Sequence, residues 1–595
     1  MATSAHMRPW RPPLGPEGFR WEIPERFNIG AACTAVHPAD DPAIVVDRGD
    51  DPPQITTFGE LGTRARRLVS VLRERGVGEG DRVAVMCAQS AETAVAHLAT
   101  YLMGAIAVPL SVKFGPEAAL FRMGDSAAVA AVFDADCYER LAAELAGLPE
   151  LRTVLVAGDA VPATPATGLT TGLTTEPTTE PVPLTGARTA GALTVLPLSV
   201  TDRADVVVVV ADTGPDDPAL LIYTSGTTGQ PKGALHGHRV VLGHMPGVVR
   251  ALDGFPQRAT SGESGDVFWT PADWAWAGGL LDVLLPSLYS GIPVVASPRR
   301  PSPETVEHLL RRYGVTCSFL PPTILKMMRA SGVDYSRTGL RAVFSGGEAL
   351  GEAVAEWAEE ALGVRVNEIY GQTECNLTVG TCHAEFPTPP GSMGRPTPGF
   401  DLVLLDSLGG DGGGDGQAVA PGEVGEICVR LPSPNAFLRY WNAPEKTADK
   451  TAGGLLHTGD LARVDDDGNF WFSGRNDDLI STAGYRVGPG EIEDQILRHP
   501  AVEEVAVIGV PDELRGEAIV AYVVPAEGVT GSGGLASEIQ ALVKERLAFY
   551  QYPREVVFMD ELPTTNTGKI RRAQLRAQHS AGAVPLSSLP TKDVQ

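Results

Sequence analysis

The sequence is poor in positive charge for its length. It has 48 lysines and arginines against 73 aspartates and glutamates, which leaves a net charge of −25 over 595 residues. Nucleic-acid-binding proteins need clustered basic side chains to neutralise phosphates, so this composition argues against a nucleic-acid partner. Long apolar runs are also lacking, because no uncharged stretch approaches the roughly 18 residues of a membrane span. We therefore expect a protein with neither a nucleic-acid partner nor a membrane span.

Cysteines are few and scattered. The seven of them, at positions 33, 87, 137, 317, 375, 382 and 428, are never spaced C-x-x-C. This arrangement disfavours both a disulfide framework and a zinc site. The first residues contain no apolar core of a secretory signal, so a cytoplasmic location is the expectation.

Elements of two kinds alternate near the N-terminus. The residues from Thr57 to Gly76 and from Ala91 to Met103 predict helices, and Arg82–Met86 between them predicts a strand. Helices alternating with strands at this spacing indicate parallel α/β architecture.

Two segments have the composition of loops. Residues 158–198 contain the repeats GLTT and TTEP, and this Thr/Pro/Gly tract predicts a disordered insertion. Residues 408–417, LGGDGGGDGQ, predict a long hairpin loop.

The last hundred residues predict a separate α+β unit. A helix is expected from Pro489, because Ile492 and Ile496 follow at helical spacing. A second helix is expected to start at Ser537, and residues after about Gln578 to form a frayed tail. The strands expected between the helices are Val502–Val510 and Ala518–Val524.

The most specific motif is YTSGTTGQPKG at residues 223–233, directly after the apolar strand Ala219–Ile222. Its three glycines allow successive backbone N–H groups to point at one anion, and Lys232 adds a positive charge. It is not a Walker A loop, because that motif requires G-K-[ST]. The segment therefore predicts a phosphate-binding loop of another kind.

This loop and five later motifs resemble those of the acyl-adenylate-forming (AMP-binding) superfamily, and the C-terminal part is most similar to short- and medium-chain acyl-CoA synthetases. The later motifs are SGGEAL (345–350), NEIYGQTEC (367–375), HTGD (457–460), FSGRNDD (472–478) and TTNTGKIRR (564–572). The resemblance implies a large N-terminal domain (1–474) of parallel-sheet α/β subdomains plus a β-barrel-like subdomain. It further implies a hinge (475–478), a small mobile α+β C-terminal domain (479–578) and a tail (579–595).

The resemblance implies ATP-dependent activation of a carboxylic acid as acyl-AMP, followed by transfer to CoA as the C-terminal domain rotates about Asp477. The implied cofactors and substrates are ATP, Mg²⁺ and coenzyme A. Lys569, Thr227 and Glu374 would be catalytic, with Glu374 as the magnesium ligand. The implied ATP- and AMP-binding residues are Thr224, Ser225, Gly226, Thr227, Thr228, Gly229, Gln230, Pro231, Lys232, Gly347, Glu348, Glu368, Ile369, Tyr370, Gly371, Gln372, Thr373, Asp460, Arg475 and Lys569. The implied CoA-binding residues are Ala483, Gly484, Tyr485, Arg486, Arg515, Tyr552, Pro553 and Arg554.

The implied acyl pocket contains Trp276, Gly278 and Gly371. Acetyl-CoA synthetases carry a tryptophan where this chain has Gly371, so a larger acid, medium-chain or aromatic, is expected. Trp274 and Trp276 either face alike on a strand or begin a core helix.

Two other functions compete with this one. The first is a stand-alone adenylation enzyme that loads the thiol of a carrier protein. The second is a nucleotide-binding protein without catalysis.

Overall fold

The computed structural model describes residues 19–158, 193–203, 208–224, 231–257, 265–348, 350–406, 417–475, 478, 480–482, 485–512, 515–547, 551–564 and 570–581. Several predicted site residues lie outside these ranges. They are Ser225, Gly226, Thr227, Thr228, Gly229, Gln230, Asp477, Ala483, Gly484 and Lys569.

The first sheet is parallel in its centre and antiparallel at its edges. Its order is β16-β15-β14-β13-β12-β10-β11-β1-β2, and β2, β15 and β16 are the antiparallel members. The strands are β1 (Pro42–Val46), β2 (Gln54–Thr57), β10 (Phe268–Trp269), β11 (Val294–Ala296), β12 (Cys317–Phe319), β13 (Ala342–Gly346), β14 (Val366–Gln372), β15 (Cys375–Gly380) and β16 (Arg395–Pro396).

The second sheet has the same plan, with the order β19-β9-β8-β4-β3-β5-β6-β7 and antiparallel β9 and β19. The predicted strand Arg82–Met86 is β3, at its centre. The strands are β3 (Arg82–Met86), β4 (Ile106–Pro109), β5 (Ala130–Phe133), β6 (Thr153–Val156), β7 (Thr194–Pro197), β8 (Pro218–Thr224), β9 (Lys232–Gly237) and β19 (Arg439–Tyr440).

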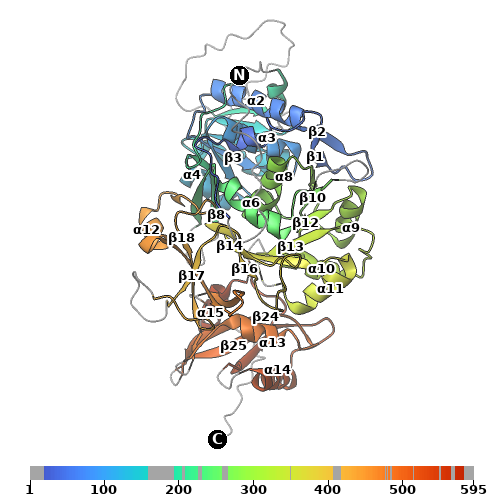
Figure 1. Cartoon of the computed structure of the whole chain (residues 1–595), viewed down its shortest axis with the longest axis vertical. Helices are drawn as coiled ribbons and strands as arrows, with labels where there is room; N and C mark the ends of the chain where they lie inside the picture. The colour runs from blue at the N-terminus through green and yellow to red at the C-terminus, as the bar shows by residue number, and fades with distance from the viewer. Residues whose placement is uncertain are drawn as a thin grey trace.

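The third sheet is antiparallel, and in place of the expected barrel-like subdomain its described strands form an open sheet of order β17-β18-β20-β21. The fourth belongs to the C-terminal unit (orange to red in Figure 1), with the order β23-β22-β25-β24 and β26 beside β25. The strands are β17 (Leu402–Leu405), β18 (Val424–Arg430), β20 (Leu455–Val464), β21 (Phe470–Arg475), β22 (Ile480–Thr482), β23 (Tyr485–Val487), β24 (Val502–Asp512), β25 (Gly516–Pro525) and β26 (Glu555–Phe558).

Helices cover the sheets, and their ends follow local sequence signals. Thr57 caps the second helix through a reciprocal capping box with Glu60. Within the described part of the chain, no helix is both long and apolar enough to span a membrane. The helices are α1 (Ile29–Ala32), α2 (Phe58–Glu74), α3 (Ala91–Leu102), α4 (Pro116–Asp125), α5 (Ala135–Leu141), α6 (Val240–Ala251), α7 (Ala277–Gly279), α8 (Leu285–Ser290), α9 (Pro303–Arg312), α10 (Pro322–Ser331), α11 (Glu352–Leu362), α12 (Pro444–Lys450), α13 (Pro489–Ile496), α14 (Gly533–Arg546) and α15 (Arg572–Ser580).

Three predicted boundaries are wrong. The segment 158–198, predicted to be a disordered insertion, ends in β7, which pairs in parallel with β6, so its last residues belong to the sheet. Residues 159–192 lie outside the described ranges. Helix α14 begins four residues before Ser537, because Ser532 supplies the N-terminal cap by accepting from the N–H of Leu535. Helix α15 continues past Gln578 to Ser580, because its Leu575 packs into the C-terminal core.

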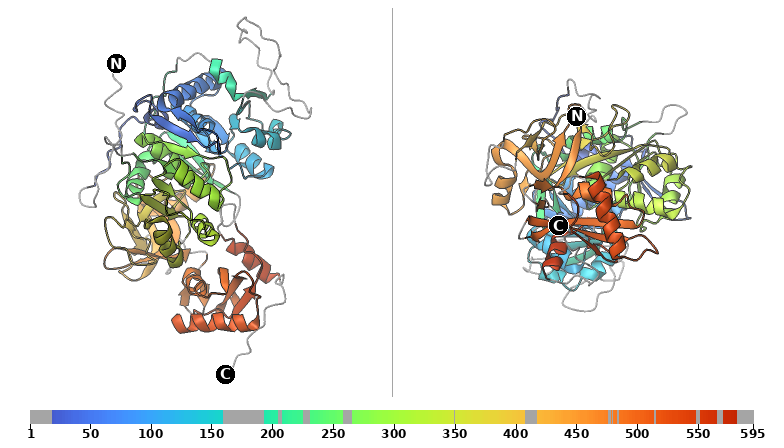
Figure 2. Two further views of the ribbon diagram at one scale, coloured as in Figure 1. Left: turned by 90° about the vertical axis from the view of Figure 1, so that its right-hand side faces the viewer. Right: turned by 90° about the horizontal axis from the view of Figure 1, so that it is seen from below.

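The C-terminal unit stands apart from the larger body when the molecule is turned (Figure 2). It has its own apolar cores on both sides of its sheet. An ion pair between Arg498 and Glu352 of α11, at 3.0 Å, connects it to the body. The fold is therefore an α/β body with a separate small α+β domain, as expected.

Candidate active site

A cleft lies where the parallel strands of the first two sheets end. Its volume, about 4320 Å³, is several times that of an ordinary ligand pocket of roughly 300–1,000 Å³. The residues after β3, β4, β8, β10, β12, β13 and β14 line it, together with part of the C-terminal unit. Crevices outside the carboxyl ends of parallel strands are where α/β proteins bind ligands. The cleft is therefore large enough for several substrates at once.

Asp460 is the centre of a hydrogen-bonded group that joins two sheets. It is 5% exposed, and its Oδ2 accepts from the Tyr370 hydroxyl at 2.7 Å and from Nε2 of Gln372 at 2.5 Å. Nε of Arg475, on the neighbouring strand, is 3.8 Å from its Oδ1. The predicted nucleotide residues of three motifs thus lie side by side, and these bonds hold the carboxylate of Asp460 in place.

Glu374 follows β14 and is buried at the edge of the cleft. Its Oε1 accepts from the hydroxyl of Tyr440, and burial and this carboxylate raise the pKa of Tyr440 far above its usual value. The phenol therefore stays a donor. Since no other described group bonds the carboxylate, Glu374 can hold a cation through its second oxygen.

The phosphate motif begins and ends on an antiparallel strand pair. Thr224 ends β8 and Lys232 begins β9, and the two residues are paired in register. The motif therefore connects the two strands as a hairpin, although residues 225–230 lie outside the described ranges. Pro231 and Lys232 line the cleft, and Nζ of Lys232 lies 5.5 Å from the ring centre of Tyr440. Burial and nearby Lys446 lower the pKa of Lys232, whereas Glu374 raises it.

The motif SGGEAL lies at the end of β13, and the motif NEIYGQTEC begins on β14. Together they form the wall of the cleft nearest the C-terminal unit. The lining residues here are Gly347, Glu348, Glu368, Ile369, Tyr370, Gly371, Gln372 and Thr373. Burial raises the pKa of Glu368 to about 7, and Asp494 of α13 adds to the rise. A hydrogen bond from the N–H of Leu350, at 3.3 Å, lowers it. The protonation of Glu368 thus depends in part on the position of the C-terminal unit.

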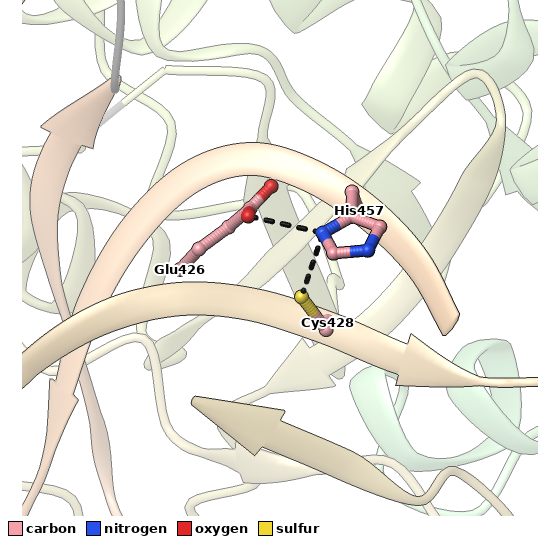
Figure 3. A group of neighbouring side chains, drawn as sticks. All are labelled: Glu426, Cys428 and His457. Carbon is pink, nitrogen blue, oxygen red and sulfur yellow. Dashed lines mark hydrogen bonds and ion pairs between the residues drawn. The ribbon is translucent and has the colours of Figure 1, made fainter. Parts of the chain in front are cut away.

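The sequence did not indicate three of the side chains that build the nucleotide region. Tyr440 bonds Glu374, and Lys450 donates at 3.1 Å both to Oε1 of Gln372 and to the carbonyl of Thr458. Nδ1 of His457 donates to Oε2 of Glu426 at 3.1 Å, three residues before Asp460 on β20 (Figure 3). Tyr440 and Lys450 belong to none of the predicted motifs, so no signal in the sequence pointed to either of them.

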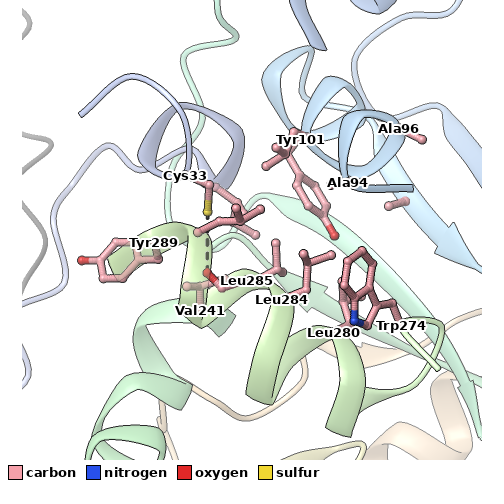
Figure 4. Close-up of a cluster of buried hydrophobic side chains, with 14 of the residues drawn as sticks. Cys33, Ala94, Ala96, Tyr101, Val241, Trp274, Leu280, Leu284, Leu285 and Tyr289 are labelled. Atoms are coloured by element: carbon pink, nitrogen blue, oxygen red, sulfur yellow. Dashed lines mark hydrogen bonds between the residues drawn. The ribbon is translucent and has the colours of Figure 1, made fainter. Parts of the chain in front are cut away.

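The acyl-pocket predictions have different outcomes. Trp276 and Gly278 line the cleft, and the ring of Trp276 packs edge-on against Phe114 at 5.7 Å. Trp274 is buried in the core among apolar helices (Figure 4). The two tryptophans therefore do not face alike, and neither alternative holds, because both lie in the loop between β10 and α7, which begins at Ala277.

The expectation that Gly371 opens the pocket is wrong for this backbone. A Cβ atom on Gly371 would lie 2.6 Å from Cα of Asn376, so the missing side chain points at the neighbouring strand β15 and not into open space. Glycine is needed there because the two backbones approach closely. A Cβ on Gly278, in contrast, would lie 2.6 Å from Cε1 of Phe319, whose ring lines the cleft. The size of the acyl pocket thus depends on Gly278 and Phe319.

The predicted CoA residues do not meet at the cleft in this arrangement. Arg515 is paired with Asp512 at 3.7 Å, and Cζ of Arg554 lies 3.9 Å from the ring centre of Tyr552. None of the described residues Arg515, Tyr552, Pro553 and Arg554 is in the cleft lining. Tyr485 and Arg486 form part of strand β23.

The residues near the C-terminus that line the cleft are instead Ile570 and the first part of α15. Arg572 holds it by bonding both carboxylate oxygens of Glu493 at 2.7 and 2.8 Å, and Arg576 bonds Asp478 at 2.5 Å. These bonds tie the helix after Lys569 to α13 and to the end of the predicted hinge.

Comparison with known proteins agrees with this geometry. Residues 31–441 match the family model of the AMP-binding enzymes, and residues 491–569 match that of the AMP-binding enzyme C-terminal domain. The acetyl-coenzyme A synthetase of Bacillus subtilis is 32% identical over 88% of this chain and 84% of its own. The mitochondrial acyl-coenzyme A synthetase ACSM4 of Homo sapiens is 30% identical over 94% of this chain and 92% of its own.

A solved structure resembles the whole fold. The anthranilate CoA ligase AuaEII in complex with anthranoyl-AMP has a TM-score of 0.79 and 26% identity, and the match covers 94% of this chain and 99% of that one. Both family models, the relatives and the assembled nucleotide region lead to one conclusion. The chain belongs to the family of AMP-binding enzymes.

Proposed function

We propose that this protein is an AMP-forming acyl-CoA synthetase, which activates a carboxylic acid with ATP and transfers the acyl group to CoA. The observation that carries the proposal is the group around Asp460, which brings Tyr370, Gln372 and Arg475 together beside Glu374 at one cleft. The activities of the similar proteins support the same reaction. The free cysteines are in keeping with a reducing compartment, and we propose a cytoplasmic location.

In the first step a carboxylate oxygen of the acid attacks the α-phosphorus of ATP, and the bond to pyrophosphate breaks. Such transfers depend mainly on positioning and on neutralising negative charge. Asp460 would hold the ribose, while Lys232 and Arg475 supply positive charge beside the phosphates. Glu374 would hold Mg²⁺, which neutralises phosphate charge when bound. Lys569 and Thr227 are assigned here from their motifs.

In the second step the sulfur of CoA attacks the acyl carbonyl carbon, AMP leaves, and the thiol proton is released. We propose that rotation at Asp477 brings the CoA-binding residues to the cleft, since Arg515, Tyr552 and Arg554 lie off its lining. Lys544 belongs with them, because its Nζ lies 4.0 Å from the ring centre of Tyr552. Two cations on one ring form a surface suited to phosphate and to a nucleobase.

The acid is proposed to be larger than acetate, medium-chain or aromatic. The aromatic side chains of Phe114, Trp276 and Phe319 line the pocket, and Gly278 leaves room for the ring of Phe319. Flat aromatic walls favour an aromatic or extended apolar acyl group. An apolar pocket separates neighbouring homologues by only about 1–3 kcal/mol per methylene, so a group of acids is expected rather than one.

The test is an acid panel from acetate to decanoate, with benzoate and anthranilate, assayed for acid-dependent pyrophosphate exchange and for thioester. Exchange with larger acids and thioester with free CoA are expected. Exchange without CoA thioester, but with acylation of a carrier protein, would favour the carrier-loading enzyme. Background exchange across the whole panel would contradict the proposal.

A further inference from the structure

Three side chains with metal-binding atoms meet on one face of the third sheet. Glu426 and Cys428 lie two apart on β18, and His457 on β20 is the direct cross-strand partner of Cys428. Nδ1 of His457 lies 3.1 Å from Oε2 of Glu426 and 3.5 Å from Sγ of Cys428, so it points at both (Figure 3). All three candidate atoms lie within 4.8 Å of one another.

These separations match the ligand shell of a tetrahedral ion. With bonds of about 2.0 Å to nitrogen and oxygen and about 2.3 Å to sulfur, tetrahedral angles place neighbouring N and O atoms about 3.3 Å apart and N and S atoms about 3.5 Å apart. The distances from Nδ1 of His457, 3.1 and 3.5 Å, are close to both values. Two of the three edges of the donor triangle therefore already have the lengths of a tetrahedral shell, and the third, between Oε2 and Sγ, is no longer than 4.8 Å.

Neighbouring backbone groups hold the side chains of Glu426 and His457 in position by hydrogen bonds. Oε1 of Glu426 accepts from the backbone N–H of Gly459 at 2.8 Å, which leaves Oε2, 3.1 Å from Nδ1 of His457, as the oxygen that faces the other two candidate ligand atoms. The ring of His457 is also hydrogen-bonded to the backbone of Ala452, and Nδ1 faces the two other donors. The hydrogen bond to the backbone of Ala452 helps to hold the ring in this orientation.

Access and charge are also suitable. Glu426 and His457 line the cleft, so an ion has a path of entry to two of the three ligands. Carboxylate and thiolate together offset the charge of a divalent ion, although Lys450 lies close enough to affect all three donors. Binding replaces the thiol proton of Cys428 by the metal and releases that proton to solvent.

We propose that Glu426, Cys428 and His457 form a binding site for a divalent transition metal of the zinc type, next to the nucleotide region. The mixed O, S and N donors suit Zn²⁺ and exclude Mg²⁺, which takes oxygen ligands. The site differs from the magnesium position at Glu374, since it lies on another sheet. Because Gly459 and Asp460 come two and three residues after His457 on β20, an ion here would hold the strand that carries the proposed ribose contact.

The experiment uses the full, untagged chain without nucleotide, in reducing buffer. Equilibrium dialysis against Zn²⁺ with a chromophoric chelator measures affinity, and Co²⁺ loading is followed by the thiolate-to-cobalt charge-transfer band. One Zn²⁺ per chain is expected. Cys428→Ala and His457→Gln are expected to weaken it by at least about 100-fold, more than the loss of an outer-shell partner. The cobalt band is expected to vanish in Cys428→Ala.

The matched control is Cys33→Ala, which removes a thiol buried among apolar side chains (Figure 4). It is expected to keep both Zn²⁺ affinity and the cobalt band. Absence of Zn²⁺ binding, or binding and a band that survive Cys428→Ala and disappear in Cys33→Ala, would overturn the proposal. Thermal melting checks the folding of each variant, and if Cys428→Ala is unfolded, His457→Gln decides by the same measurements. Because the readout is metal binding, the outcome is independent of acyl-CoA synthesis.

Discussion

The nucleotide region of the body and the CoA region of the C-terminal unit are prepared to different degrees. Bonds of 2.7 and 2.5 Å join Asp460 of β20 to Tyr370 and Gln372 of β14 at the wall of the cleft, and Arg475 of β21 lies 3.8 Å from the same carboxylate. Arg515, Tyr552 and Arg554 pair among themselves or with neighbours, off the cleft. This difference supports the proposal that the described nucleotide contacts already stand at the cleft, whereas the CoA residues reach it by a movement of the C-terminal unit.

The strongest test of this division is Lys569→Ala. Loss of a positive charge at developing negative charge should lower acid-dependent pyrophosphate exchange by about 10²–10³-fold. Thioester formation from supplied acyl-adenylate should be spared, because that step does not use the pyrophosphate contact. Rapid-quench measurement of each half-reaction decides, with Lys326→Ala, on α10, as the matched lysine control. Equal losses in both half-reactions would contradict the division.

Asp460→Ala should affect both half-reactions through nucleotide binding. It removes the acceptor of Tyr370 and Gln372 and the ribose contact, so KM for ATP should rise by about 10–100-fold, as expected for hydrogen bonds to a charged group. Isothermal titration with ATP and steady-state kinetics measure the change. Asp467→Ala, exposed in the turn between β20 and β21, is the control. Unchanged ATP affinity would remove Asp460 from the nucleotide site.

Gly278→Val tests the acyl pocket of the body. The added side chain would push against Phe319, so kcat/KM for the largest accepted acid should fall about 10-fold relative to propionate. Competition between the two acids in one assay gives the ratio. Gly147→Val, which has open space around its Cβ, is the control. A ratio that stays constant would place the acyl group elsewhere.

Arg554→Ala should affect the C-terminal region alone. Loss of the cation beside Tyr552 should raise KM for CoA by several-fold, up to about 10-fold, and leave pyrophosphate exchange unchanged. Arg430→Ala, whose charge lies on the third sheet, is the control. An equal effect on pyrophosphate exchange would contradict the assignment of this region to CoA.

The pH dependence of stability that Glu368 causes tests the contact between the body and the C-terminal unit. Its pKa of about 7 lies above the usual value of 4.5, so the folded state holds the proton more tightly than the unfolded state. Stability should therefore fall as pH rises from about 4.5 to about 7. Glu368→Gln should be more stable than the wild type at pH 8, by an amount on the order of 1–3 kcal/mol, and equal to it near pH 4. Urea unfolding at both pH values measures this.

Asp494→Asn is the matched variant for that test, because Asp494 of α13 contributes to the raised pKa of Glu368. It should reduce the slope of stability against pH without removing it. A slope that does not change in Asp494→Asn would mean that burial alone acts on Glu368.

The elements and the chemistry of the motifs could be predicted to different extents. Strand β3 has the predicted bounds, and α2 and α3 lie within the predicted ranges, because alternating apolar patterns and caps are local signals. The start of α14 was missed because Ser532 and Ser537 are both acceptable caps, and packing of Leu535 chose between them. The family was confirmed, because its motifs are short and ordered along the chain.

By itself the sequence determined the α/β class, the order of the motifs and the residue types available to bind nucleotide. Only the tertiary structure decided the direction of Gly371, the bond between Tyr440 and Glu374, and the meeting of Cys428 with His457. The spacing of the cysteines argued against a zinc site, because a spacing motif reveals only ligands that lie close together in the sequence. Contacts between residues distant along the chain arise from strand register, and a side chain's direction depends on the neighbouring backbone, so neither can be read from a motif.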